Sequence, residues 1–186
     1  SLYHSVFANG IGYLTLMFKV HDIPEEYYPY IGILPDVFSK LDTKNYTYAE
    51  LCNEINLATG GISVSQNFYP DATDPDQYKI CLEISTKALE DKLGKAVELM
   101  KELMLTSNLT DGKRLKEILA ENNSRMQEYM MGAGHSVAVT RALSYCNPKE
   151  AAEDMLDGIG QYRLTQELET GFQEKKEWKS FRPSAR

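Results

Sequence analysis

Histidine, serine and acidic side chains are the residues of this chain whose types could support hydrolysis or bind a metal. The histidines are His4, His21 and His135, which lie far apart in the 186-residue sequence and lack a partner at helical spacing. A hydrolytic zinc site needs about three protein ligands and one open position. Two of those ligands commonly share one helical face. Only convergence of the three distant histidines in space would supply such a set, so we predict no metal site.

The segment Gly134-His135-Ser136-Val137-Ala138 is superficially similar to the nucleophile elbow of hydrolases. That motif needs a second glycine where Ala138 stands, and a strand before it, whereas a long helical pattern precedes this segment. Adjacent residues on a helix point about 100° apart, so His135 is poorly placed to deprotonate Ser136. The segment instead indicates a glycine-bearing break between helices, with Ser136 capping the next helix. An independent hydrolase using Ser136 and His135 is therefore the remotest hypothesis.

Two other patterns also favour structural roles. Glu50 and Glu54 lie one helical turn apart on a face that we expect to be solvated, and Glu50 has a capping role of its own. The segment Gly132-Ala133-Gly134 is too short for a phosphate loop and lacks a following Lys-Ser/Thr pair. We therefore predict that this chain holds no catalytic, no cofactor-binding and no metal-binding residue.

The elements that would position these residues belong to one domain of ordinary composition. The chain is 42% hydrophobic and 25% charged, and a chain of its length buries roughly 70% of its unfolded surface. A net charge of −7 argues against binding to nucleic acid or anionic membranes, and an acidic wall would favour cationic peptides. No run approaches the roughly 18 apolar residues of a membrane span. Cys52, Cys81 and Cys146 are odd in number, and the apolar patterns around Cys52 and Cys81 indicate buried thiols in a reducing compartment.

Strand patterns are confined to the first half of the chain. Two strands, Tyr3 to Phe7 and Ile11 to Val20, flank a hairpin signal at Asn9-Gly10. Two more strands are predicted over Ile62 to Tyr69 and over Tyr78 to Thr86. The last of these alternates strictly, which predicts one covered face and one wetter face.

Helical periodicity accounts for most of the remaining sequence. Thr47 and Glu50 form a capping box at one helix start, and Gly60 suits the left-handed position that ends that helix. Pro35 is expected to kink or break the first helix. With four strands and six or seven helices, the chain predicts an α+β domain in which helices cover an antiparallel sheet. The helical patterns are Tyr27 to Leu41, Thr47 to Thr59, Leu89 to Thr106, Asp111 to Met131, Ser136 to Tyr145, Lys149 to Leu156 and Ile159 to Glu174.

Several of these motifs together resemble a known family. The central one runs from Thr43 through Tyr46, Tyr48, Glu50 and Leu51 to Thr59-Gly60-Gly61-Ile62-Ser63. In order and spacing the set is similar to the insulinase-type (M16) metallopeptidases, in particular their presequence-protease branch (subfamily C), from about Tyr3 to about Phe172. The other matching segments are Asn9 to Leu14, Ile23-Pro24, Tyr28-Pro29-Tyr30, Ser124-Arg125, Gly134-His135-Ser136 and Arg141-Ala142.

The resemblance implies a place in a larger chain. Proteins of this branch carry four related domains that pair into two lobes around a peptide-holding chamber. Their zinc is bound in the first domain by an H-x-x-E-H helix and a more distant Glu, and this chain resembles the third domain. The matching helix here, around Tyr30 to Val37, has no His and no Glu. The resemblance thus implies a non-catalytic repeat of a zinc-dependent metalloendopeptidase, with zinc in the catalytic domain of the parent chain.

The first hypothesis is therefore a domain that walls the chamber and holds unfolded peptides, with the catalytic N-terminal lobe of the same parent as its partner. It implies no nucleic-acid or membrane partner, and a location in bacterial cytoplasm or an organelle matrix rather than secretion. The alternative is a stand-alone peptide-binding or scaffold protein with a degenerate peptidase fold, which would hold an extended peptide at an open sheet edge. A parent reading frame that contains an H-x-x-E-H helix upstream would favour the first hypothesis.

The domain is expected to span residues 1–174, with residues 175–186 as a basic tail without periodicity. The family pattern implies a further strand after the last helix, and the tail does not supply it. We therefore expect a sheet truncated at its C-terminal end, with an open edge that could pair with a second copy. The tail either marks that truncation or is non-native.

Overall fold

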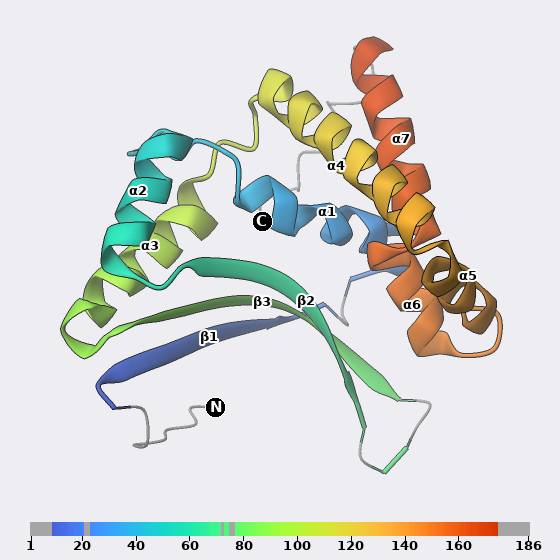
Figure 1. Ribbon diagram of the computed structural model, residues 1–186, viewed down its shortest axis with the longest axis horizontal. Helices are drawn as coiled ribbons and strands as arrows, with labels where there is room; N and C mark the ends of the chain where they lie inside the picture. The colour runs from blue at the N-terminus through green and yellow to red at the C-terminus, as the bar shows by residue number, and fades with distance from the viewer. Residues whose placement is uncertain (1–8, 21–22, 72, 75–76, 175–186) are drawn as a thin grey trace.

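The computed structural model describes residues 9–20, 23–71, 73–74 and 77–174 of the chain. Within them, three strands form an antiparallel sheet in the order β1-β3-β2, and seven α-helices accompany it (Figure 1). This confirms the α+β class with an antiparallel sheet. The strands are β1 (Ile11–Lys19), β2 (Ile62–Pro70) and β3 (Tyr78–Leu89); the predicted strand at 3–7 lies outside the described residues.

The helices largely follow the predicted ranges. They are α1 (Tyr28–Phe38), α2 (Tyr48–Ala58), α3 (Leu93–Thr106), α4 (Gly112–Gly132), α5 (Gly134–Leu143), α6 (Pro148–Asp157) and α7 (Ile159–Glu174). Short 3₁₀ turns, η1 (Glu25–Tyr27) and η2 (Glu90–Lys92), precede α1 and α3. The first helix is thus shorter than expected at both ends. The tail at 175–186 lies outside the described residues, and neither the domain boundary at 174 nor the truncation is tested.

Alternation along the strands separates two faces of the sheet. In the register, Leu14, Leu16 and Phe18 of β1 face the same side as Ile80, Leu82 and Ile84 of β3. Val64, Gln66 and Phe68 of β2 also face that side. This apolar side packs against the helices, which lie on one side of the curved sheet in Figure 1. No described helix covers the opposite side.

Helix α1 is the centre of the core. Ile31 belongs to the cluster that joins it to β3 and α6, and Ile33 and Val37 belong to the cluster that joins it to α4. Phe38 packs on the third cluster, which is formed by α2 and α3. One helix therefore contacts all three apolar clusters, because buried side chains extend from several sides of it. Leu41 lies beyond the end of α1 and is still buried, as expected.

Pro35 was expected to kink or break the first helix; α1 continues through it, so the break does not occur. A proline has no N–H, so Pro35 leaves the carbonyl of Ile31 without its usual helical donor. Gln66 Nε2, on β2, donates to that carbonyl at 2.7 Å. The side chain of a strand residue thus replaces the missing backbone bond and ties α1 to the sheet.

The two ends of α2 test two of the local sequence signals, the capping box and the helix-ending glycine. The capping box is confirmed: Thr47 Oγ1 accepts from the Glu50 amide, and the Glu50 carboxylate accepts from the Thr47 amide at 2.9 Å. The prediction for Gly60 is wrong, because Thr59 ends α2 in an extended conformation and Gly61 has the positive φ of 104°. Gly60 instead lies against the Lys87 side chain, where a Cβ would come within 2.6 Å of Lys87 Cε.

The turn at Asn9-Gly10, directly before β1, has the backbone that its sequence predicts, although the other strand of the predicted hairpin lies outside the described residues. Asn9 and Gly10 both have positive φ, of 46° and 75°, which is the backbone of a type I′ hairpin turn.

The prediction that Ser136 caps a helix is wrong. Helix α5 already starts at Gly134, its N-cap is Ala133, and no side chain caps it.

Helix α5 is held by a buried ion pair rather than by apolar burial, since it contains no buried residue. Arg141 Nη1 lies 2.7 Å from Asp154 Oδ2 on α6, and Asp154 is only 2% exposed. The other carboxylate oxygen accepts from the Ile159 amide at 3.2 Å, at the start of α7. One carboxylate therefore joins α5, α6 and α7.

None of the described helices has the length and apolarity that a membrane crossing requires.

Replacement of Gln66 by Leu should lower the free energy of unfolding by about 1–3 kcal/mol, because it leaves the buried Ile31 carbonyl without a donor. In the background of Gln66→Leu, Pro35→Ala should restore most of the loss, because the substituted alanine regains an N–H that can donate to Ile31. Urea unfolding of both single variants and the double variant measures this coupling. Strictly additive effects of the two substitutions would contradict the role assigned to Gln66.

Candidate functional site

The residues singled out for chemistry do not assemble into a hydrolytic centre. His135 is exposed on α5 next to Ser136, and the two side chains share no hydrogen bond. His4 and His21 lie outside the described residues. Within the part of the chain that the structure describes, no group of three or more His, Cys, Asp or Glu side chains could hold a metal ion. Since two histidines are not described, the absence of a zinc site stays a prediction.

Helix α1 occupies the place where the resemblance implies the zinc helix of a catalytic domain. Its one acidic residue is Asp36, which forms an ion pair with Arg125 Nη2 at 2.7 Å and accepts from the Asn122 amide of α4. The helix has no histidine. A carboxylate already engaged by a guanidinium and an amide, on a helix without imidazole, does not fit a hydrolytic zinc ion.

The uncovered side of the sheet, which we name the open face, is the strongest candidate for a functional surface. It combines exposed apolar and aromatic side chains with small hydroxyl side chains. Tyr13, Met17 and Tyr69 are 70%, 51% and 41% exposed. The open face comprises Tyr13, Thr15, Met17 and Lys19 of β1, Ser63, Ser65, Asn67 and Tyr69 of β2, and Lys79, Cys81, Glu83, Ser85 and Lys87 of β3.

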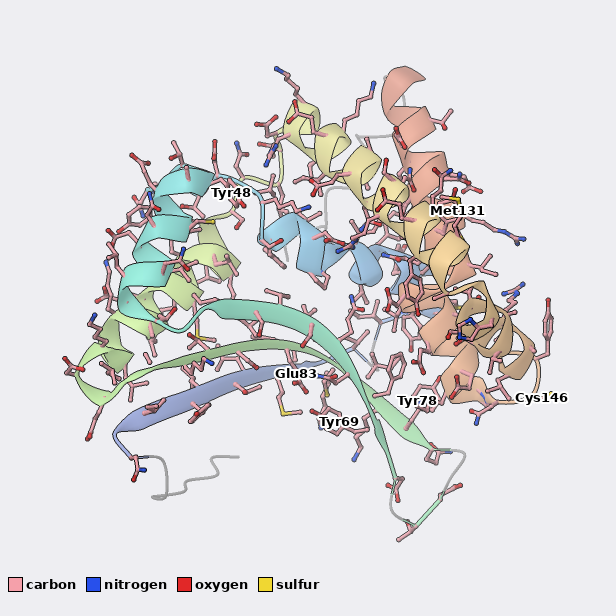
Figure 2. All side chains as sticks on the ribbon, in the orientation of Figure 1. Tyr48, Tyr69, Tyr78, Glu83, Met131 and Cys146 are labelled. Carbon is pink, nitrogen blue, oxygen red and sulfur yellow. The ribbon has the colours of Figure 1, made fainter. Side chains whose placement is uncertain are left out.

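Glu83 forms a buried polar centre on the open face (Figure 2). It is 7% exposed although no described helix covers it. Asn67 Nδ2 donates to Oε2 at 2.8 Å, and the Tyr69 hydroxyl donates to Oε1. The side chains of the neighbouring strand β2 thus bury the carboxylate and satisfy it.

The carboxylate of Glu83 also raises the pKa values of its neighbours Tyr69 and Cys81. The hydrogen bond to Glu83 raises the pKa of Tyr69 above its usual range, and the charge of Glu83 adds to the rise. Burial raises the pKa of the Cys81 thiol, and Glu83 raises it further. At neutral pH both groups therefore stay protonated: Tyr69 is a hydrogen-bond donor and Cys81 an unreactive thiol.

Sequence reasoning missed this centre. The alternation in β3 placed Glu83 on the wetter face, and the structure confirms the face but buries the side chain. The signal that could have revealed it is the register of the β2–β3 hairpin, in which Asn67 pairs with Cys81 and Tyr69 with Lys79. This puts an amide and a phenol beside the carboxylate on one face.

The sequence profile of a peptidase-associated domain, the one described for subfamily C of the M16 peptidases, matches residues 1–168. This chain belongs to that peptidase-associated family. It is 33% identical over 169 residues to "Protein HypA" of Clostridium perfringens, covering 91% of this chain and 17% of that protein. It is 30% identical over 163 residues to "Presequence protease, mitochondrial" of Yarrowia lipolytica, covering 87% and 16%. The family predicted from the sequence motifs is thus confirmed.

The relatives are much longer than this chain. Against "Presequence protease, mitochondrial" of Schizosaccharomyces pombe, with 29% identity, it again spans only 16% of the relative. Among solved structures, the crystal structure of a conserved protein from Enterococcus faecalis V583 superimposes with a TM-score of 0.62 at 11% identity. That match covers 89% of this chain and 40% of the other, and supports the fold alone.

Glu83→Gln should lower the pKa of Tyr69 toward its ordinary value of about 10, because the negative charge that opposes phenol ionisation is removed. NMR titration of the Tyr69 ring carbons measures this pKa. In the unsubstituted chain, the folded-state pKa lies above the unfolded one. The stabilisation from this contact is therefore fully present below about pH 10 and is lost as pH rises through the folded pKa.

Glu117→Gln is the control for that titration, since it removes an equal charge from the exposed surface of α4. It should leave the pKa of Tyr69 unchanged. A Tyr69 pKa that is the same in Glu83→Gln and in the unsubstituted chain would contradict the assigned contact.

Proposed function

We propose that this chain is a non-catalytic domain of a zinc-dependent metalloendopeptidase, and that its open face forms part of the wall that holds peptides. The observation that carries the proposal is a sheet whose described helices lie on one side only. A family domain that buries one sheet face and leaves the other to solvent is suited to line an enclosed space.

The support for a non-catalytic role is the set of residue types that the chain offers to a metal. The sequence has no H-x-x-E-H motif, and the helix in the matching place has one carboxylate, engaged by Arg125 and Asn122. The zinc that cleavage requires would be held by another domain of the parent chain. This chain would then affect cleavage through peptide binding and closure.

The open face suits unfolded peptides of varied sequence. Tyr13 and Met17 supply apolar surface that adapts to different side chains, and Ser63, Ser65 and Thr15 supply hydroxyls. The net charge of −7 is not carried by the open face, whose charged residues are Lys19, Lys79, Lys87 and the buried Glu83. Contacts of this kind hold a peptide without selecting one sequence.

The proposed partner is the remainder of a larger parent chain, and its catalytic lobe in particular. The support is the length of the relatives, of which this chain spans 16–17%. We place the parent in bacterial cytoplasm or in an organelle matrix; two of the relatives are named as mitochondrial proteins.

A second candidate function, a stand-alone peptide-binding or scaffold protein, has one observation in its favour. β1 and β2 are the outer strands, and no described strand pairs with the far edge of either. Such an edge can add an extended peptide or a second copy of the chain by strand pairing. A parent reading frame without an H-x-x-E-H helix would favour this candidate.

Peptide holding is tested by NMR titration of the ¹⁵N-labelled chain with an unfolded peptide of alternating uncharged polar and apolar residues. Shift changes should fall on β1, β2 and β3. The double variant Tyr13→Ala/Met17→Ala should weaken binding roughly tenfold, since full burial of one such side chain is worth about 1.5–3 kcal/mol.

The matched control is Leu57→Ala/Leu105→Ala, which removes apolar side chains that are 71% and 76% exposed on α2 and α3. It should leave the affinity unchanged. Shift changes confined to the helical side, or equal weakening by the control, would contradict the proposed role of the open face.

A further inference from the structure

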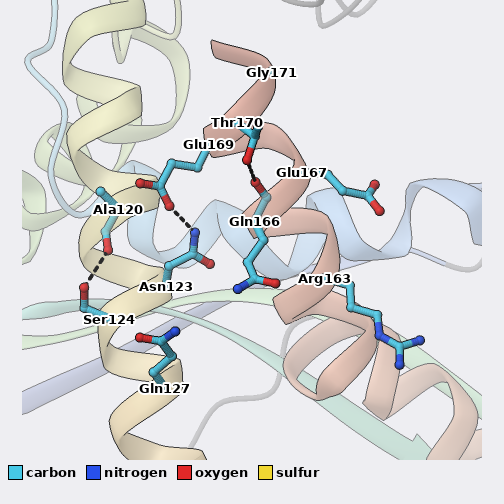
Figure 3. Close-up of a pocket in the computed structure, with 10 residues that line it drawn as sticks. All are labelled: Ala120, Asn123, Ser124, Gln127, Arg163, Gln166, Glu167, Glu169, Thr170 and Gly171. Atoms are coloured by element: carbon cyan, nitrogen blue, oxygen red, sulfur yellow. Dashed lines mark hydrogen bonds between the residues drawn. The ribbon is translucent and has the colours of Figure 1, made fainter. Parts of the chain in front are cut away.

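We propose that the groove between α4 and α7 is a binding site for a guanidinium group, the side chain of an arginine. The groove has a volume of about 1050 Å³ and lies on the helical side, away from the open face. Figure 3 shows Asn123, Gln127 and Gln166 extending into the space between the two helices. Arg163 and Glu167 of α7 also line the groove, so with Glu169 its lining carries one basic and two acidic side chains.

Asn123 gives the groove a buried acceptor without a donor. The residue is 7% exposed, and its Nδ2 donates to Glu169 Oε2. Because a carboxylate only accepts, this bond fixes which end of the amide faces Glu169. Asn123 Oδ1 is consequently turned away from Glu169, buried and without a hydrogen-bond partner among the described residues. Such an orphan acceptor is costly and marks a place for a donor.

Four other polar residues of the groove each direct one donor to a protein oxygen. Ser124 Oγ donates to the Ala120 carbonyl at 3.0 Å, and Thr170 Oγ1 donates to the Gln166 carbonyl at 2.8 Å. The side-chain amides of Gln127 and Gln166 both donate to the Tyr162 hydroxyl, at 3.0 and 2.6 Å. Ser124 and Thr170 therefore present oxygen lone pairs to a ligand, and each glutamine presents its carbonyl oxygen and one remaining N–H.

Charge and geometry select the ligand. Glu169 Oε1 accepts from no described residue, so a full negative charge lies beside the orphan acceptor. A guanidinium has five N–H donors, no acceptor and a planar fork that matches carboxylate geometry. An ammonium offers fewer donors, and a neutral amide would bring an acceptor of its own. Asn123 Oδ1 has almost no accessible surface, so binding requires side chains of the groove to move; Gln127 and Gln166 line the groove and are exposed.

The test is NMR titration of the ¹⁵N-labelled chain with N-acetyl-arginine amide. Saturable shift changes are expected on α4 and α7, with weaker binding of N-acetyl-lysine amide. N-acetyl-citrulline amide, a neutral compound of the same shape that carries a carbonyl, should not bind. Equal shifts with the citrulline compound, or no shifts on α4 and α7, would overturn the proposal.

The variant Glu169→Gln tests whether the charge of Glu169 contributes to arginine binding. The Gln side chain can still accept from Asn123, so the fold is retained while the charge is lost. It should weaken arginine binding roughly tenfold, as expected for loss of a charged hydrogen-bond partner. Glu98→Gln removes the same charge from the exposed surface of α3, outside the groove, and should have a much smaller effect. Equal effects of the two variants would show that only the overall charge matters and would overturn the assigned site.

Discussion

The constraint on which this structure depends is the two-residue alternation of side chains along three paired strands. One parity carries apolar residues and packs on α1, α2, α3 and α6, and the other forms the open face. A one-residue shift of register would exchange the two faces and expose the core. The same alternation brings Asn67, Tyr69 and Glu83 together, so the polar centre of the open face is a consequence of the register that builds the core.

Local signals with a defined hydrogen-bond pattern were predictable from the sequence. The Thr47–Glu50 capping box and the Asn9-Gly10 turn both form as expected. Each depends on residues within a few positions of one another, so no tertiary contact is needed to specify it. The faces of the strands were equally predictable, because side-chain alternation is a local property.

Features that depend on distant contacts were not predictable. Pro35 is tolerated inside α1 because Gln66, from another element, supplies the missing donor. Gly60 lies against the Lys87 side chain and has no positive φ. The burial of Glu83 needs two side chains from the neighbouring strand, and the orphan acceptor of Asn123 arises only where α4 meets α7. In each instance the deciding contact joins residues on different elements, so the local sequence does not predict it.

The measurement that tests the non-catalytic role most directly is zinc content of the purified chain by elemental analysis, combined with a quenched-peptide cleavage assay on the same sample. A domain without an H-x-x-E-H helix is predicted to hold no zinc and to cleave no peptide. Near-stoichiometric zinc with chelator-sensitive cleavage would contradict this, and would mean that His4, His21 and His135 converge on a metal after all.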